Sequence, residues 1–305
     1  MKQLRRLDAV PKDPYRRMLK SPLRFISCSE EAFRALERER PGLIIIEGDS
    51  ILIGRAHPGV VSLEYGFRDS DAFVTHFPGM LQRLLPALDT ESAPMGLRLR
   101  LTDAPSRPFI EPTLSAQAFD VTRDWLRMTL AKLPSGGPRT DKIATGFALR
   151  PARGDDAEEI AKLDAAAFAM SWLTVEIVQE RMGQEPVLKM LEDSASGRAV
   201  GFLSLRVERP GEGYVSDMAL HPDYQRRGLG EAMMRWVLAW FRQEGLESAA
   251  LTVSTDNGPA IALYRKLGFE PTEKGLDYRR PLDEDEVRQV LEKRVTTHIR
   301  MRRRY

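Results

Sequence analysis

The amino-acid sequence predicts an α/β (α+β) fold organised as two domains. The chain has 305 residues, which suits two domains of about 150 residues each. Between residues 214 and 245 an apolar run, a glycine turn and an amphipathic stretch follow one another, which predicts a strand and then a helix. A similar order of hairpin, strand, helix and strand recurs in the first half of the chain, so each domain is expected to combine a sheet with helices.

Composition limits the function classes to consider. The 46 basic and 44 acidic residues give a formal net charge of +2, which argues against bulk binding of nucleic acid. Cys28 is the single cysteine, so no internal disulfide can form. The amino terminus is charged and has no apolar signal region, and the longest aliphatic run, residues 43–46, is far too short to span a membrane. We therefore expect a cytoplasmic protein without a membrane or nucleic-acid partner.

The clearest local pattern lies at residues 214–245. Val215, Met218 and Leu220 form an apolar run that ends at a His-Pro turn, as a buried strand does. After the turn, apolar residues recur with the period of a helix that packs on a sheet, and Gly245 supplies a left-handed stop. The apolar residues of this helix are Met233, Trp236, Val237, Trp240 and Phe241.

The sequence Gln-Arg-Arg-Gly-Leu-Gly at residues 225–230 opens this helix. The first N–H groups of a helix lack internal partners and carry the positive end of the helix dipole, so they can bind a phosphate group. Gly228 and Gly230 allow a tight turn and the close approach of a pyrophosphate, and Arg226 and Arg227 add positive charge. Two glycines alone are more often an ordinary turn, and the spacing fits neither a P-loop nor a dinucleotide-binding fingerprint.

Two motifs resemble those of the GNAT superfamily of acetyltransferases. The first is its acetyl-CoA loop, Gln/Arg-x-x-Gly-x-Gly/Ala, which follows a strand ending in a small-residue triplet and a Pro turn; the triplet here is Met218-Ala219-Leu220. The second is the closing motif of the family, which is very similar to the string from Asn257 to Phe269. The resemblance implies GNAT-like domains, each with a mixed, mostly antiparallel twisted sheet flanked by helices.

Four segments are expected along the chain. Proline, glycine and polar residues without an apolar anchor at 134–141 are typical of a linker. We therefore predict a degenerate GNAT-like domain at residues 1–136, a linker at 137–146, the GNAT acetyltransferase domain at 147–282 and a basic helical tail at 283–305. The tail is expected to dock on its own protein or on a second copy, as in a homodimer.

The first half of the chain resembles a degenerate copy of the second. Residues 118–128 resemble residues 268–278, which indicates an internal duplication. The loop at 66–72 has no paired glycines and carries two acids, so it would repel a pyrophosphate. The alternative is an unrelated α/β domain. The expected elements are a helix at 33–40, a helix at 73–88 interrupted by Pro78 and Gly79, and strands at 43–46, 51–53, 60–65 and 97–101.

The resemblance implies a role for each motif residue. Acyl transfer from a thioester to an amine needs alignment, a neutral amine and a proton for the departing thiolate. The backbone of Met218, Ala219 and Leu220 would hydrogen-bond the pantetheine arm of acetyl-CoA, and Asn257 would touch the same arm. Tyr264 would be the general acid, because a phenol is protonated at neutral pH; the alternative is a packed helix aromatic. The pyrophosphate would be cradled by Arg226, Arg227, Gly228, Leu229, Gly230 and Glu231.

The general base is the open point of this assignment. In ribosomal-protein acetyltransferases of the superfamily, a glutamate on the strand before the position of Asn257 often takes the amine proton. Thr252 stands there in this chain, and a hydroxyl cannot replace a carboxylate unaided. Asp217 on the preceding strand, or a water held by the backbone, is the substitute base; Asp217 is equally explained as a structural acid paired with an arginine.

Three functions agree with these motifs. The first is an acetyl-CoA-dependent N-acetyltransferase that acts by direct transfer on a primary amine of a small molecule or peptide, without a metal ion. The second is a non-catalytic acyl-CoA sensor, and the third is a scaffold whose degenerate half recruits a protein. The intact loop with Asn257 and Tyr264 favours catalysis, whereas Thr252 in place of the glutamate keeps the sensor in consideration. The acceptor is not encoded in any motif of the sequence.

Overall fold

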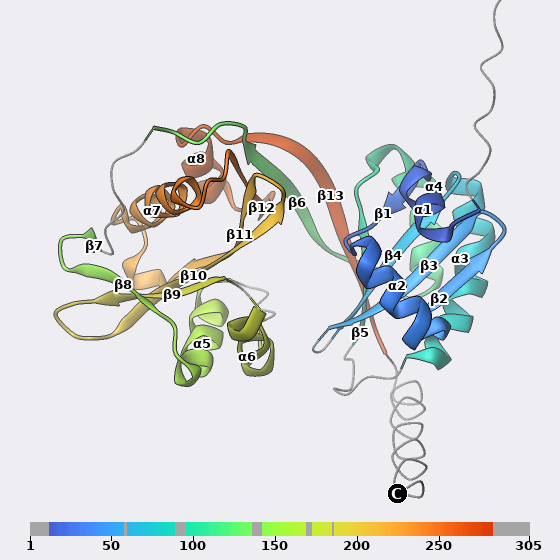
Figure 1. The fold of residues 1–305 in the computed structure, drawn as a ribbon, viewed down its shortest axis with the longest axis horizontal. Coiled ribbons are helices and arrows are strands. Elements are labelled where there is room, and N and C mark those ends of the chain that lie inside the picture. Colours follow the sequence, from blue (N-terminus) through green and yellow to red (C-terminus); the bar gives the residue numbers. More distant parts are fainter. Residues whose placement is uncertain are drawn as a thin grey trace, which may run out of the picture. The chain divides into compact units, whose positions relative to one another are not determined.

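The computed structural model describes residues 12–57, 60–88, 96–135, 142–168, 173–184 and 186–282. The chain divides into two compact units (Figure 1). Unit 1 contains the chain up to Asp124 and again from Lys274, and unit 2 contains Trp125–Glu273. The tail expected at 283–305 and residues 137–141 of the expected linker lie outside the described residues.

Unit 1 contains a mixed sheet in the order β2-β3-β4-β5-β13, with β1 also paired to β4. Only β4 and β5 run parallel; the other pairs are antiparallel. Helices α3 and α4 bury their apolar side chains on one face, and α1 and α2 pack on Ile51 and Ile53 of the other face. The strands are β1 Leu23–Phe25, β2 Ile44–Glu47, β3 Ser50–His57, β4 Val60–Phe67, β5 Gly96–Leu101 and β13 Glu270–Pro281; the helices are α1 Pro14–Lys20, α2 Glu30–Glu39, α3 Ser70–Leu84 and α4 Arg107–Ala116.

The sheet of unit 2 is also mixed and has the order β13-β6-β12-β11-β10-β9-β8-β7, to which β13 contributes Glu270–Glu273. Only β11 and β12 run parallel. Figure 1 shows α7 and α8 on one face of this sheet and α5 and α6 on the other, and each pair of helices covers its own apolar cluster. The strands are β6 Asp120–Leu130, β7 Lys142–Ala144, β8 Phe147–Pro151, β9 Val187–Asp193, β10 Ala199–Arg209, β11 Glu212–Leu220 and β12 Ser248–Ser254; the helices are α5 Ala157–Ala167, α6 Val175–Gln184, α7 Leu229–Gln243 and α8 Gly258–Lys266.

These sheets confirm the predicted α/β (α+β) class, with mostly antiparallel strands flanked by helices. The two halves of the chain also repeat one order of elements. A hairpin, a strand, a helix, a strand, a helix and a long last strand occur as β2-β3-β4-α3-β5-α4-β6 and again as β9-β10-β11-α7-β12-α8-β13. The similarity of residues 118–128 to 268–278 has a conformational counterpart, because Ala118 and Gly268 both adopt a positive φ, of 58° and 89°. Phe119 and Phe269 follow them and are fully buried.

The boundaries of the two units differ from the expected domain limits, 1–136 and 147–282. Strand β6 pairs with β12 from Leu130↔Ala249 to Trp125↔Ser254, so residues 125–136 belong to unit 2. Strand β13 pairs with β5 from Leu276↔Leu101 to Pro281↔Gly96, so residues from 274 belong to unit 1. Part of the expected linker, at 142–144, is strand β7. Each sheet is therefore completed by the last strand of the other half of the chain.

Two helices of unit 1 differ from their expected ranges. Helix α2 begins at Glu30, because the Ser29 side chain accepts a hydrogen bond from the N–H of Ala32 and caps its first turn. Helix α3 is continuous through Pro78, where an interruption was expected. The Phe73 and Phe77 rings stack with their centroids 4.5 Å apart inside the core, and this burial outweighs the helix-breaking tendency of proline.

Candidate functional site

Strands β11 and β12 part in the middle of the unit 2 sheet. Their parallel pairing covers Glu212–Val215 and Ser248–Leu251 and then ends, while β11 continues along β10 and β12 continues along β6. Ser216 is an extra residue in β11 at this point, because Ser204 pairs with Asp217 and Leu205 pairs with Val215. Such a bulge bends its strand. The edge of β11 from residue 216 to 220 is consequently open towards β12, and we call this opening the splay.

Helix α7 begins next to the open end of the splay with a backbone that no side chain caps. Gly228 is its N-cap residue, with φ +77° in the left-handed region, and Arg226 also has a positive φ of 59°. The first intrahelical bond runs from the N–H of Ala232 to the carbonyl of Gly228. The N–H groups of residues 229–231 therefore have no intrahelical acceptor and face outward from the helix start. This geometry fits an anion at the position predicted for the pyrophosphate.

The charges around this helix start leave it positive. Arg226 is exposed, and the Arg227 guanidinium carbon lies 4.9 Å from the centre of the Tyr224 ring. Glu231 carries the nearby negative charge, but its carboxylate contacts Lys266 Nζ at 2.5 Å and Arg235 Nη2 at 2.8 Å. Hydrogen bonds from Lys266 and Arg235 lower the pKa of Glu231, which keeps it ionised inside this network. Glu231 thus joins α7 to α8 rather than opposing an anion.

Helix α8 places two predicted residues on the same side of the sheet as α7. Asn257 caps the helix, because its Oδ1 accepts a hydrogen bond of 3.2 Å from the N–H of Ala260; the amide hydrogens of its Nδ2 are left for another partner. Tyr264 is buried among apolar side chains, with its ring centre 6.0 Å from that of Phe269. Its hydroxyl makes no hydrogen bond to the residues that the structure describes. Burial raises the pKa of Tyr264 to about 12, so the hydroxyl stays protonated at neutral pH.

Asp217, the proposed substitute base, lies on the opposite face of the sheet, with α5 and α6. Its carboxylate forms an ion pair with Arg181 and accepts a hydrogen bond of 2.9 Å from Ser204 Oγ. The side chain is 9% exposed. Both contacts favour the structural explanation of this acid, because its carboxylate already binds Arg181 and Ser204.

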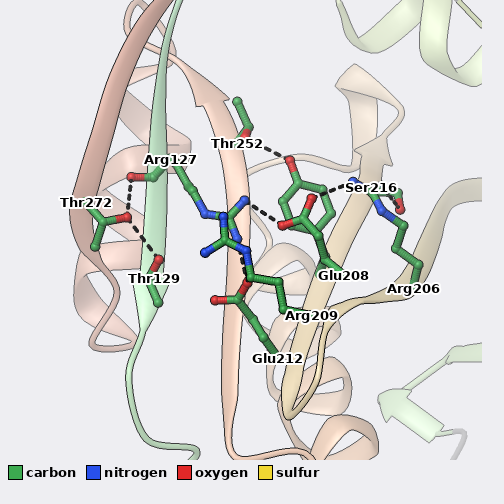
Figure 2. Close-up of polar contacts among 10 residues, drawn as sticks. Arg127, Thr129, Arg206, Glu208, Arg209, Glu212, Ser216, Thr252 and Thr272 are labelled. Atoms are coloured by element: carbon green, nitrogen blue, oxygen red, sulfur yellow. Dashed lines mark hydrogen bonds and ion pairs between the residues drawn. The ribbon is translucent and has the colours of Figure 1, made fainter. Parts of the chain in front are cut away.

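One contact at the splay was not predicted from the sequence. The Tyr214 hydroxyl donates a hydrogen bond of 2.8 Å to Oγ1 of Thr252, which stands where the resemblance described above led us to look for a glutamate. Figure 2 shows Thr252 at one end of a group of arginine and glutamate side chains on β6, β10 and β11. The two hydroxyls come from strands 38 residues apart in sequence, so only the polar residues at alternate positions of β12 hinted at this contact.

Comparisons with known proteins agree with this geometry. The model of the acetyltransferase (GNAT) family matches residues 157–269, which include both motifs and the splay. A mycothiol acetyltransferase from Clavibacter michiganensis is 32% identical over 66% of this chain and 68% of its own length, and one from Saccharomonospora viridis is 30% identical over 74% and 79%. This chain belongs to the GNAT acetyltransferase family. Among solved structures, a GCN5-related N-acetyltransferase from Sphaerobacter thermophilus aligns with a TM-score of 0.60 at 17% identity, over 83% of this chain and 85% of that chain, and shows the fold alone.

Membership of the GNAT family makes the protein an acetyltransferase and extends the resemblance beyond one domain, because the relatives align over most of both chains. In the part of the chain that the structure describes, no three His, Cys, Asp or Glu side chains are grouped as metal ligands would be. Among the same residues, no helix has both the length and the apolar character needed to cross a membrane.

Proposed function

We propose that unit 2 transfers an acetyl group from acetyl-CoA directly to a primary amine. The observation that carries this proposal is the uncapped start of α7 beside the open edge of β11. Acetyl-CoA contains a pyrophosphate, which an uncapped helix start can bind. It also contains an arm with amide groups, which can hydrogen-bond the free backbone groups of a strand. Acetyl-CoA supplies a reactive thioester, so the chain has to bind, align and transfer protons.

The residues fit acetyl-CoA as follows. The N–H groups of Leu229, Gly230 and Glu231, with Arg226 and Arg227 beside them, would hold the pyrophosphate, and Gly228 would allow it to approach the backbone. The free backbone edge of residues 218–220 would hydrogen-bond the pantetheine arm, and the Asn257 amide, whose oxygen is used by the helix cap, would donate to the same arm. This arrangement directs the reacting end of the arm into the splay.

Tyr264 is proposed as the general acid of the transfer. Its hydroxyl has no hydrogen-bond partner among the described residues, and its ring packs on the α7 and α8 side of the sheet. The pKa of about 12 keeps the phenol protonated, so it is ready to donate to a thiolate as the C–S bond breaks.

The acceptor is proposed to be an amine of a small molecule. The two relatives described above carry the name mycothiol acetyltransferase, which supports a small-molecule acceptor. A peptide amine remains the alternative acceptor within the same chemistry.

Detection of free thiol would test this function. Acetyl-CoA and the full chain are incubated with a panel of amines, amino-acid amides and peptides, while calorimetry measures acetyl-CoA binding. Binding together with thiol release that depends on one acceptor class is the expected result. Binding without release from any amine would favour the acyl-CoA sensor, for which the paired state of Asp217 is the motivating observation. Absence of binding would overturn both functions.

A further inference from the structure

A network of charged side chains covers the face of the unit 2 sheet opposite α7 and α8, next to the splay (Figure 2). Its centre is Arg127 of β6, which contacts Glu208 of β10 and Glu212 of β11, each at 2.6 Å. Arg206 of β10 donates to Ser216 Oγ at 2.8 Å and to Glu208 Oε1 at 2.9 Å. Burial alone would lower the pKa of Arg127, but the negative charges of the two glutamates raise it. The network therefore stays charged and internally neutralised.

Three carboxylates of β10 and β11 on this face are each engaged by an arginine. Glu208 and Glu212 are bound by Arg127, and Asp217 is bound by Arg181 of α6. The other charged groups facing this region are Arg206, Arg209 of β10, which lies 3.9 Å from Glu212, and buried Asp164 of α5. Among these described groups, every carboxylate therefore already has a partner.

Two hydroxyls occupy the closed end of the splay instead. Tyr214 precedes the last paired residue of β11, and Thr252 follows the last paired residue of β12. The Tyr214 ring is fixed by the guanidinium of Arg206, whose carbon lies 4.1 Å from the ring centre, and by that of Arg127 at 5.3 Å. Because Tyr214 donates its proton to Thr252, the lone pairs of the Tyr214 oxygen remain available to accept an N–H, and the Thr252 hydroxyl can still donate.

We propose that the Tyr214–Thr252 hydroxyl pair orients the acceptor amine for attack and that the enzyme takes this amine from solution in its neutral form. This inference rests on the proposed function. Residues 216–220 of β11 span roughly 13 Å. A pantetheine arm that runs along them would bring its thioester to the Tyr214–Thr252 hydroxyl pair, where β11 and β12 come together. The amine would then approach from the face of the network, opposite to Tyr264.

The proposed step balances without a protein base. The lone pair of the neutral amine forms the N–C bond at the thioester carbonyl, and the C–S bond breaks with its electron pair on sulfur. The sulfur receives a proton from Tyr264, and the nitrogen, acidic once it is bonded to the carbonyl, loses its extra proton to water. Tyr264 is then reprotonated from solvent, so one thiol and one amide replace one thioester and one amine.

A site of this kind selects acceptors by the basicity of their amines. At about pH 7.5, roughly a third of an α-amine but only about one in a thousand of a lysine ε-amine is neutral. The substrate class indicated is therefore a weakly basic primary amine, such as the α-amine of an aminoacyl group, rather than an alkylamine or lysine side chain.

The pH profile tests the inference directly. We would measure kcat/KM between about pH 6 and pH 10 for hydroxylamine, an amino-acid amide and an N-acetyl-lysine amide. The expected profile rises with the neutral fraction of each nucleophile, so its midpoint moves with the acceptor. A midpoint fixed at one pH for all three would reveal a protein base and overturn the inference. Turnover absent even with hydroxylamine, the least basic of the three nucleophiles, would overturn it as well.

Variants at the pair separate positioning from structure. Tyr214→Phe keeps the ring and its arginine contacts, and should raise the acceptor KM by about three- to tenfold with an unchanged KM for acetyl-CoA. The matched control is Tyr278→Phe in unit 1, which also removes a tyrosine hydrogen bond, the one to Glu111. This variant should change neither the KM for the acceptor nor the KM for acetyl-CoA. Thr252→Glu should install a base and lower the midpoint of the profile, whereas Thr252→Gln should not. Unchanged kinetics of Tyr214→Phe would contradict the assignment.

Calorimetry gives a readout that does not depend on turnover. Binding of the amino-acid amide to the enzyme saturated with CoA should release protons in proportion to the ammonium fraction of the probe, measured in buffers of different ionisation enthalpy. Binding without proton release would overturn the inference while leaving the proposed acetyltransferase function intact. Failure of CoA and acetyl-CoA to bind would instead overturn the proposed function, so the two failures are distinguishable.

Discussion

Units 1 and 2 share one order of elements, but they differ at the start of the helix that follows the third strand of that order, which is α3 in unit 1 and α7 in unit 2. In unit 1 the Asp69 side chain accepts a hydrogen bond of 2.8 Å from the N–H of Ala72 and caps α3. In unit 2 the corresponding residue is Gly228, and no side chain caps α7. The backbone hydrogen bond from Ala72 lowers the pKa of Asp69, which keeps it negative. The helix start of unit 1 therefore already holds an anion, whereas that of unit 2 has no side-chain cap.

The same contrast extends to the strands. Strands β4 and β5 pair in parallel only at Val61–Leu63, as β11 and β12 pair only at their beginnings. Beyond that point β3 occupies one edge of β4, and β1 pairs with residues 65–67 on the other edge. The Tyr65 hydroxyl also donates to the carbonyl of Arg100 in β5 at 2.9 Å. The opening in unit 1 is thus filled by the chain itself.

The third difference concerns the position of the proposed acid. Leu114 of α4 and Tyr264 of α8 each accept, through the carbonyl, a hydrogen bond from the N–H of a buried phenylalanine, Phe119 and Phe269. The two positions are equivalent in the repeat, yet one side chain is apolar and the other carries a hydroxyl. Within one shared framework, an N-cap, an inserted strand and one side chain therefore separate unit 1 from the unit proposed to bind acetyl-CoA.

The largest effect is expected at Gly228. Gly228→Val places a β-branched residue at φ +77° and a side chain where the pyrophosphate must approach, so acetyl-CoA binding should fall below detection by calorimetry. Gly245→Val, at φ +76° with equally open space at the other end of α7, is the control and should keep the affinity. Retained binding in the Gly228 variant would place the phosphate site elsewhere and remove the contrast with Asp69.

Tyr264→Phe should reduce turnover on the order of a hundredfold while acetyl-CoA affinity stays unchanged, because the hydroxyl meets charge that develops only as the thioester breaks. Its pKa, raised by burial to about 12, implies that it does not lose its proton across the neutral to mildly alkaline range, so the parent enzyme should show no alkaline loss of rate from this group. Steady-state rates and calorimetry on the same variant provide the measurement. Equal turnover in both proteins would make Tyr264 a packing residue like Leu114.

In unit 1 the strongest effect on stability is expected at Glu64, which is fully buried beside the filled opening. Burial alone would raise its pKa, but hydrogen bonds from Ser27 and the Cys28 N–H and the charge of Arg55 lower it. A lowered pKa stabilises the fold above the ordinary carboxylate pKa, and this stabilisation is lost as the pH falls through the lowered value.

Glu64→Gln should therefore cost about 2 kcal/mol of unfolding free energy at neutral pH and weaken the acid dependence of stability. Glu47→Gln, which breaks the half-exposed pair with Arg83, should cost about 0.5 kcal/mol or less. Denaturant unfolding at several pH values measures both variants. Equal costs would show that the segment after β1 is not held by Glu64.

Local chemistry explains which of these features the sequence predicted. Three features depend on residues close together in the sequence, so residue spacing predicts them. They are the glycines of residues 225–230, the acids after β4 and the apolar stripe of α7. The pairing of β1 with β4 and the exchange of β6 and β13 between the sheets depend on contacts between distant segments, for which sequence spacing carries no signal. Tyr214 was missed for the same reason, since its partner Thr252 lies on another strand.

The strand exchange also decides how the comparison must be tested. A chain cut near residue 137 would remove β13 from unit 1 and β6 from unit 2, so the halves would lack a strand that each sheet uses. Binding stoichiometry in the full chain avoids this problem. We expect one acetyl-CoA per chain, held by unit 2.

The smallest expected effect is that of opening the helix start of unit 1 alone. Asp69→Gly removes the internal anion and recreates the glycine of α7, yet β1 and Tyr65 still fill the opening between β4 and β5. The variant should therefore keep a stoichiometry of one acetyl-CoA per chain, with unchanged affinity at unit 2, because no free strand edge exists for the pantetheine arm. A helix start without a strand edge offers only weak, salt-sensitive attraction to phosphate. Isothermal titration with acetyl-CoA measures this for Asp69→Gly and for the double variant Asp69→Gly/Gly228→Val. A second binding site in Asp69→Gly, or any binding site in the double variant, would mean that the capping aspartate alone separates the two units.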